Sequence, residues 1–388
     1  MRTISQLQIG FAPRLAALYA AMFVVLGIQL PFFPLWLKAK GLDAQMIGVV
    51  LAAPMVARIF AVPLVARAAD RRDALRAAIV LAAAGSAGGF LLVGLAQAPL
   101  AILAAYALVS LASTPLMPLC DSYALKGLSA RGRAYGPVRL WGSAAFVAGS
   151  FAAGLATDLI PARDLIWLIV AGSVVAAVAA LPLAPVHTSP PVPVPATRRN
   201  LLRDPAFIAV LAAASLIQSS HAVYYGFSAL QWHALGLDGT AIAALWALGV
   251  VAEIVLFALQ GRLPPFLRPQ VLLMAGALGG AVRWTAMALD PPVALLPALQ
   301  LLHAASFGAT HLGTLGFVAA AAPPGQAATA QGYLAVVIGT TMAAASALSG
   351  VLYGAFGSLA YAAMASAAVA GGGAAYVAHR AARNVVAG

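Results

Sequence analysis

GLDAQMIGVVLAAPMVARI, residues 41–59, decides the fold, because the chain carries a second version of this stretch. The second version, GLDGTAIAALWALGVVAEI, occupies residues 236–254 and agrees with the first at eight of nineteen positions. Alanine-rich segments can agree by chance, but the Gly-Leu-Asp that opens both favours an internal duplication. The sequence therefore predicts two homologous halves.

The rest of the chain suits lipid rather than water. Of 388 residues, 63% are hydrophobic and 8% are charged, with a mean hydropathy of +0.96, outside the range of a soluble domain. A membrane-spanning helix needs roughly 20 mostly apolar residues. We therefore predict an all-α membrane protein with twelve spans, near residues 12–37, 43–68, 74–97, 99–126, 134–158, 164–184, 205–232, 238–261, 270–289, 292–320, 326–355 and 358–379.

One long polar interruption, PVHTSPPVPVPATRRNLLRD at residues 185–204, divides the spans six and six. Its proline content indicates a linker. We predict an N-terminal six-helix bundle over residues 1–184 and a C-terminal six-helix bundle over residues 205–388. Two pseudo-symmetric bundles of this kind are a transporter architecture, with the substrate site near mid-membrane where the repeats meet.

The basic residues predict how the chain is oriented. A net charge of +12 could suggest a nucleic-acid partner, but with both termini in the cytoplasm sixteen of the 22 Lys and Arg lie at cytoplasmic ends of spans. This asymmetry predicts cytoplasmic termini and a lipid bilayer, not a nucleic acid, as the partner. The first apolar segment is long and lacks a clean cleavage site, so we interpret it as a span. Arginine exceeds lysine beside abundant alanine, which suggests a GC-rich bacterial genome and the inner membrane.

Nothing in the sequence indicates catalysis. The single cysteine, Cys120, excludes an internal disulfide and disfavours a Cys-based metal site. Asp-rich prenyltransferase motifs and HExxH are absent from the sequence. We therefore predict no enzyme activity, no metal and no cofactor.

Five charged residues fall at bilayer depth, away from the ends of the predicted spans, where an unpaired charge is costly: Arg58, Asp121, Arg139, Glu253 and Arg283. Residues equally far from the middle of a hairpin lie at similar depths, because each helical residue rises ~1.5 Å. Asp121 and Arg139 are each nine residues from position 130, and Glu253 and Arg283 are each fifteen from position 268. We expect each acid to face its arginine. A purely structural role, fastening two helices, stays open for both pairs.

Arg58 has no acidic partner across its own hairpin. Three arginines against two acids leave the predicted interior with about one positive charge, which a bound anion would balance. This favours a carboxylate substrate. Helix-forming residues 299–317, LQLLHAASFGATHLGTLGF, carry His303 and His311 about two turns apart. Together with Glu253, these histidines suggest a proton relay.

The segment PLCDSYALKGLSARGRAYGPVRLWGSAAFVAG, residues 118–149, resembles helices four and five of the major facilitator superfamily, in the branch that holds lactose permease and the bacterial 3-phenylpropionate transporters. FFPLWL at 32–37 resembles the end of that branch's first helix, and residues 301–317 look like the tenth helix of the phenylpropionate group. Weaker similarity covers the whole chain. The resemblance implies a twelve-helix, proton-coupled importer that works by alternating access.

The resemblance also implies roles for particular residues. Asp121 and Arg139 match the acid and arginine that hold substrate, and Glu253, Arg283 and His303 match coupling and binding residues. Phe146 stands where the sugar transporter has a stacking tryptophan, and Ser306 stands at its helix-ten acid, so galactoside transport is disfavoured.

The superfamily's loop signature after helix two survives in part in ARAADRRDALR, residues 66–76. Asp70, Arg71, Arg72 and Arg76 remain, while Ala66 and Asp73 replace its glycines. We expect Asp70, Arg71 and Arg76 to act at a cytoplasmic gate.

Together these features predict a monomeric proton symporter that imports a small, aromatic monocarboxylate such as 3-phenylpropionate. The predicted substrate-binding residues are Arg58, Asp121, Arg139, Phe146, His303 and His311. The predicted proton-coupling residues are Glu253, Arg283 and His303. The alternatives are a nucleoside or sugar proton symporter and a drug or metabolite efflux antiporter.

Overall fold

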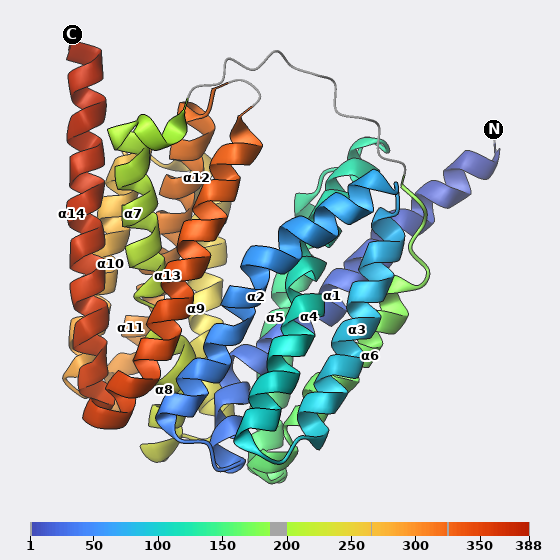
Figure 1. Cartoon of the computed structure of the whole chain (residues 1–388), viewed down its shortest axis with the longest axis horizontal. Coiled ribbons are helices and arrows are strands. Elements are labelled where there is room, and N and C mark those ends of the chain that lie inside the picture. Colours follow the sequence, from blue (N-terminus) through green and yellow to red (C-terminus); the bar gives the residue numbers. More distant parts are fainter. Residues whose placement is uncertain (1, 187–199, 265, 324–325, 388) are drawn as a thin grey trace. The chain divides into compact units, whose positions relative to one another are not determined.

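The computed structural model describes residues 2–186, 200–264, 266–323 and 326–387, and this part of the chain is helical with no β-strand. It divides into two compact units: unit 1 is Met1–Pro190 with Ala229–Ala247, and unit 2 is Pro191–Ser228 with Leu248–Gly388 (Figure 1). Most of the predicted linker 185–204 lies outside the described residues. The predicted bundle limits, 1–184 and 205–388, therefore stay a prediction.

Apolar helices make up both units. In the part of the chain that the structure describes, eleven continuous stretches are long and apolar enough to cross a membrane, the last being Thr329–Ala381. That stretch contains two helices, α13 (Ala327–Phe356) and α14 (Ala360–Ala387), which meet at Gly357. Gly357 has a φ of +57°, a left-handed conformation that glycine adopts without steric cost. The structure is therefore consistent with the predicted count of twelve.

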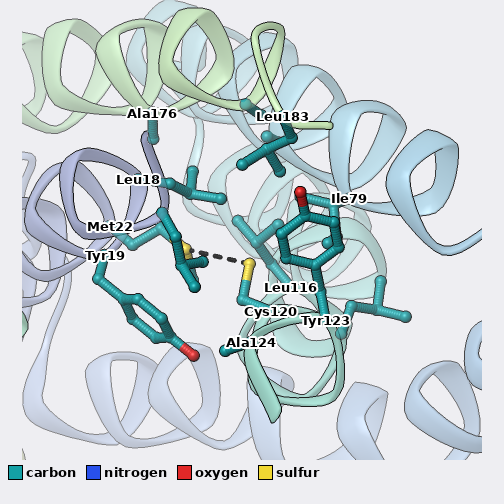
Figure 2. Packing of buried hydrophobic residues seen from close by; sticks show 14 of the residues in the cluster. Leu18, Tyr19, Met22, Ile79, Leu116, Cys120, Tyr123, Ala124, Ala176 and Leu183 are labelled. Atoms are coloured by element: carbon teal, nitrogen blue, oxygen red, sulfur yellow. Dashed lines mark hydrogen bonds between the residues drawn. The ribbon is translucent and has the colours of Figure 1, made fainter. Parts of the chain in front are cut away.

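Unit 1 begins with six helices in chain order: α1 (Arg2–Ala39), α2 (Ala44–Arg71), α3 (Leu75–Leu95), α4 (Pro99–Ser129), α5 (Gly136–Leu159) and α6 (Ile166–Ala180). Its apolar core comes from α1, α3, α4 and the end of α6. Figure 2 shows this packing, with the Cys120 thiol 3.6 Å from the Met22 sulfur. Cys120 is fully buried in this core, as a small apolar side chain.

The repeated Gly-Leu-Asp makes the same turn in both copies. After α1, the Gly41 and Leu42 amides donate to the carbonyls of Lys38 and Leu37, and Asp43 caps α2 by accepting from the Met46 amide at 2.7 Å. Between α8 (Ala222–Ala234) and α9 (Gly239–Leu259), the Gly236 and Leu237 amides donate to His233 and Trp232, and Asp238 accepts from the Ala241 amide at 2.7 Å. Gly41 and Gly236 have φ values of +85° and +86°. Helix end, glycine and N-cap therefore form one motif, which both copies retain.

Glycines bring α1 and α5 into close contact. A Cβ added to Gly149 would lie 2.5 Å from the Val24 carbonyl oxygen, and one added to Gly27 would overlap the Phe146 carbonyl oxygen. Both obstacles are backbone atoms, which cannot rotate away as a side chain can. Close packing of this kind is how small residues hold membrane helices together.

We expect Gly149→Ala to lower the midpoint of thermal unfolding in detergent, because the added methyl group must push α5 away from α1 at a cost of about 1–3 kcal/mol. Gly88→Ala is the matched control, because a Cβ there meets open space, and it should leave the midpoint unchanged or raise it. Equal midpoints for the two variants would refute the close contact.

Unit 2 contains α7 (Pro205–Ser219), α10 (Pro269–Ala288), α11 (Leu296–Leu301), α12 (Thr310–Ala321), α13 and α14, while α8 and α9 contribute to both units. Its apolar core includes side chains from α7, α10, α12 and α13, among them Phe207, Ile217, Leu273, Phe317 and Leu334. Two predicted spans are not continuous α-helices. The span 205–232 is interrupted at Ser220 and His221, and the span 292–320 contains a π-helical turn at Ala304–Ala309.

Serine side chains accompany the first interruption. The Ser219 hydroxyl donates to the Ser215 carbonyl, and the Ser220 hydroxyl donates to the Ile217 carbonyl at 2.7 Å. Such bonds satisfy carbonyls at a helix end that lies away from water. π-turns within helices often accompany functional residues, and this one directly follows His303.

Candidate functional site

The first polar cluster lies in unit 1 and centres on Asp121 of α4. One carboxylate oxygen of Asp121 accepts from the Tyr19 hydroxyl at 2.5 Å and from the Tyr135 hydroxyl at 2.8 Å. Tyr19 is fully buried on α1. Tyr135 lies just before α5 and is partly exposed. Because an ionised carboxylate only accepts, both hydroxyls donate to Asp121.

Arg139 of α5 lies beside this cluster without pairing with its acid. Its guanidinium carbon is 4.0 Å from the centre of the Phe23 ring and 5.6 Å from the centre of the Tyr19 ring. Within the described residues, Arg139 has neither a hydrogen bond nor an ion pair. Tyr19 contacts both Asp121 and Arg139 in place of the direct pair that hairpin depth predicts, because equal depth does not determine which side chain fills the space between.

Replacing Tyr19 by phenylalanine tests this arrangement. The variant removes a buried donor to a carboxylate, so we expect a loss of about 1–2 kcal/mol of stability in detergent. Tyr135→Phe removes the less buried of the two donors and should cost less. A Tyr19→Phe protein as stable as the wild type would show that the Tyr19 hydroxyl does not stabilise Asp121.

The second polar cluster lies in unit 2 around Arg283 of α10, whose side chain is fully buried. One guanidinium nitrogen donates to the Gln300 side-chain oxygen at 2.6 Å, and another lies 3.1 Å from His303 Nδ1. The guanidinium carbon is 4.4 Å from the centre of the Tyr224 ring and 4.6 Å from that of the Trp284 ring. Polar and aromatic neighbours of this kind partly offset the cost of burying a cation.

His303 connects Arg283 to Glu253, so the predicted direct pair becomes a chain of three residues. His303 Nε2 lies 3.5 Å from a Glu253 carboxylate oxygen. Because a guanidinium can only donate, His303 Nδ1 must accept from Arg283. The proton of neutral His303 is then on Nε2, which points it at Glu253. A second proton on Nδ1 would break the bond to Arg283.

His221 occupies the interruption between α7 and α8. Its Nδ1 lies 3.2 Å from the carbonyls of both Ile217 and Gln218, so this nitrogen carries a proton, and its Nε2 lies 3.2 Å from the Ser306 hydroxyl. Its ring is 5.6 Å from that of His303. Ser306, at the position of the family's helix-ten acid, therefore pairs with a histidine that the sequence did not single out.

His311 lies on α12, beyond the π-helical turn that follows His303, and makes ring contacts. The Phe307 ring stacks between His303 and His311, and its centre is 5.2 Å from the His303 ring and 6.1 Å from the His311 ring. The His311 ring is also 5.9 Å from the Phe257 ring. The predicted two-turn spacing thus produces an aromatic stack, and within the described residues His311 contacts the Phe257 and Phe307 rings rather than the polar atoms of the Arg283 chain.

Two further residues predicted to bind substrate are Arg58 and Phe146. Arg58 on α2 is exposed, and no hydrogen bond or ion pair involves it within the described part of the chain. Phe146 on α5 is buried, where α5 packs against α1. Within the described residues, no hydrogen bond, ion pair or ring contact joins either residue to Asp121 or Arg139, so their assignment to a substrate site stays a prediction.

The predicted gate residues make distinct contacts at the ends of helices. Asp70 lies 3.7 Å from the Lys126 ammonium, with both side chains partly exposed. Arg76 donates to the Leu181 carbonyl at 2.8 Å, at the C-terminal end of α6 where a cation is favourable. Arg71 is exposed. Asp73 has a φ of +45°, in the left-handed region that glycine adopts most easily.

Sequence reasoning also missed Asp158, at the end of α5. Its carboxylate accepts from the Gly239 amide at 2.9 Å and lies 3.5 Å from the Thr240 hydroxyl, at the first turn of α9. Gly154 permits this approach, because a Cβ on it would overlap the Gly239 carbonyl. A carboxylate at a helix N-terminus is stabilising. The signal in the sequence that could have revealed this contact is the charged side chain of Asp158 within an otherwise apolar segment.

With this geometry described, comparison with known proteins assigns the family. A model described as the MFS_1 like family matches residues 13–363. The chain is a member of that family. It is 33% identical over 352 residues to the probable 3-phenylpropionic acid transporter of Escherichia coli (strain K12), covering 87% of this chain and 90% of the relative. It is 30% identical over 304 residues to the maltose permease of Geobacillus stearothermophilus, and this match covers 75% of this chain and 74% of the relative.

Solved structures confirm the fold of this MFS_1 like protein. The nucleoside transporter NupG matches with a TM-score of 0.79 and 17% identity, covering 95% of this chain and 99% of NupG. A bacterial homologue of the human lysosomal transporter Spinster matches with a TM-score of 0.72 and 15% identity, covering 96% of each chain. The predicted major facilitator fold is therefore confirmed. The protein is a multi-pass membrane transporter for a small molecule, not an enzyme.

Proposed function

We propose that the protein is a proton-coupled symporter that imports a small aromatic monocarboxylate, such as 3-phenylpropionate, by alternating access. It acts as a monomer in the bacterial inner membrane with both termini in the cytoplasm. The asymmetry of basic residues supports the orientation, and the name of the Escherichia coli relative supports the substrate class.

The observation that carries the substrate proposal is the environment of Arg139. Its guanidinium stacks on Phe23, and its N–H groups have no acceptor in the described part of the chain. The neighbouring acid, Asp121, is already bonded to two tyrosine hydroxyls. A substrate carboxylate can therefore take up the Arg139 donors in a bidentate, charge-assisted pair. The Phe23 and Tyr19 rings offer apolar surface for the aromatic part of the substrate.

The chain from Glu253 to Arg283 supports proton coupling. Glu253 is partly exposed, with 19% of its side-chain surface accessible, whereas Arg283 is fully buried. Arg283 restricts His303 Nδ1 to the role of acceptor, so His303 is not the proton carrier and the partly exposed carboxylate of Glu253 gains and loses the transported proton. His303 orients Glu253 through Nε2, and Arg283 keeps His303 in that tautomer. We assign the proton to Glu253 and a positioning role to His303.

A ligand panel tests the substrate class directly. Purified protein is screened by thermal shift against aromatic monocarboxylates, nucleosides and sugars at two pH values. We expect stabilisation by 3-phenylpropionate, none by its neutral amide 3-phenylpropanamide, and loss of the effect in Arg139→Gln. Stabilisation by nucleosides or sugars alone would contradict the proposal and favour the corresponding symporter. Export of a dye on expression in cells would favour an efflux antiporter.

A further inference from the structure

Unit 1 contains a partly open cavity that plays no part in the proposed function. It has a volume of about 100 Å³ and lies among α1, α3, α4 and α6. Most of its lining is apolar, and Figure 2 labels three of the lining side chains, Met22 of α1, Leu116 of α4 and Ala176 of α6. The Asp121 and Arg139 side chains do not line it. The cavity is therefore separate from the proposed substrate-binding residues.

Two serine hydroxyls at this cavity are unused. Serines inside an α-helix commonly donate to a carbonyl one turn back, as Ser86 and Ser110 do at 2.7 and 2.6 Å. In the described part of the chain, neither Ser113 nor Ser173 has a hydrogen-bond partner, although Ser173 is only 3% exposed. Both residues line the cavity, and Ser113 is partly exposed, so each hydroxyl is available to a hydrogen-bonding partner inside it.

Gln29 adds a third polar group to the lining. Its amide bonds the Tyr106 hydroxyl at 2.7 Å through one polar atom, which leaves the other for the cavity. No charged residue lines the cavity, and a charge placed there without a partner would be strongly unfavourable. The occupant must therefore be neutral, with an apolar body and a group that both donates and accepts hydrogen bonds.

The volume sets the size of the occupant. A dry cavity of about 150 Å³ accepts benzene, which has six non-hydrogen atoms. A cavity of about 100 Å³ suits about four or five such atoms. We propose that this cavity is a binding site for a small neutral alcohol, whose hydroxyl bonds Ser113, Ser173 or Gln29 and whose alkyl part contacts Met22, Leu116 and Ala176.

Saturation-transfer NMR with 1-butanol tests the site on the full-length protein in detergent. We expect saturable binding to the wild type that is weaker by about ten-fold or more in Ala176→Leu, because the larger side chain fills the cavity. Ala171→Leu is the matched control, because Ala171 is exposed on the same helix, and it should bind 1-butanol as the wild type does.

Further probes separate the site from partition into detergent. Butyrate, which is charged, should not bind, and Ser173→Val should weaken 1-butanol about five-fold while keeping the cavity nearly full size. The proposal would be overturned if the wild type and Ala171→Leu bound 1-butanol no better than Ala176→Leu does. It would also be overturned if butyrate bound as well as 1-butanol. Thermal shift with 3-phenylpropionate on the same variants reports the proposed transport site independently.

Discussion

Glu253→Gln is expected to abolish uptake of 3-phenylpropionate driven by a pH gradient, leaving the level of liposomes without protein. Glutamine keeps the size of the side chain and can still accept from His303 Nε2, but it cannot carry the transported proton. Exchange of labelled for unlabelled substrate needs no net proton movement, so it should persist in the variant. Initial uptake rates in proteoliposomes with and without an imposed gradient measure both activities.

A matched control is Asp164→Asn, which neutralises a carboxylate in the short 3₁₀ segment Ala162–Asp164 before α6. It should leave gradient-driven uptake unchanged. Accumulation by Glu253→Gln at the wild-type rate would remove Glu253 from the proton role. Loss of exchange together with uptake would indicate a general defect, and folding is then checked by size-exclusion chromatography.

Arg139→Gln is expected to raise the KM for 3-phenylpropionate by about 10- to 100-fold, because it removes a charge-assisted bond to the substrate carboxylate. Arg139 has no ion-pair partner in the described part of the chain, so its replacement leaves no buried carboxylate without a counter-charge. Asp121 keeps both tyrosine donors. We therefore expect the folded protein to be as stable as the wild type.

Arg133→Gln is the control for Arg139→Gln, because Arg133 is exposed in the turn before α5. Its KM should equal that of the wild type. Arg139→Lys keeps the charge without the planar pair of donors and should recover only part of the affinity. A KM for Arg139→Gln within two-fold of the wild type would contradict the substrate site, as would a loss of stability large enough to explain the defect.

Hydropathy and the repeat predicted most of the fold, because both signals are local. The apolar segments fall on the observed helices, and the repeated Gly-Leu-Asp marks the same turn twice. The interruptions of two spans were not predicted, because the polar run QSSH at residues 218–221 is short and the π-turn leaves the apolar pattern unchanged. Ser220 and His221 are compatible with a helix by composition, and the π-turn at Ala304–Ala309 depends on packing.

The charged residues were found in sequence, but their partners were not. Equal distance from a hairpin gives depth along the helix and leaves rotation and neighbours undetermined. Tyr19 therefore contacts both Asp121 and Arg139, and His303 lies between Glu253 and Arg283. The count of three arginines against two acids did not reveal that Arg58 lies exposed on α2. Asp158 of α5 was overlooked because it accepts a hydrogen bond from the first turn of α9, and that contact exists only in the tertiary structure.

The most direct test of proton-coupled import is the movement of protons when substrate is added. Wild-type proteoliposomes are suspended in weak buffer, and the external pH is recorded as 3-phenylpropionate enters. The account predicts alkalinisation outside the vesicles that saturates with substrate concentration and is absent in Glu253→Gln. Saturable uptake by the wild type without any change in external pH would contradict it.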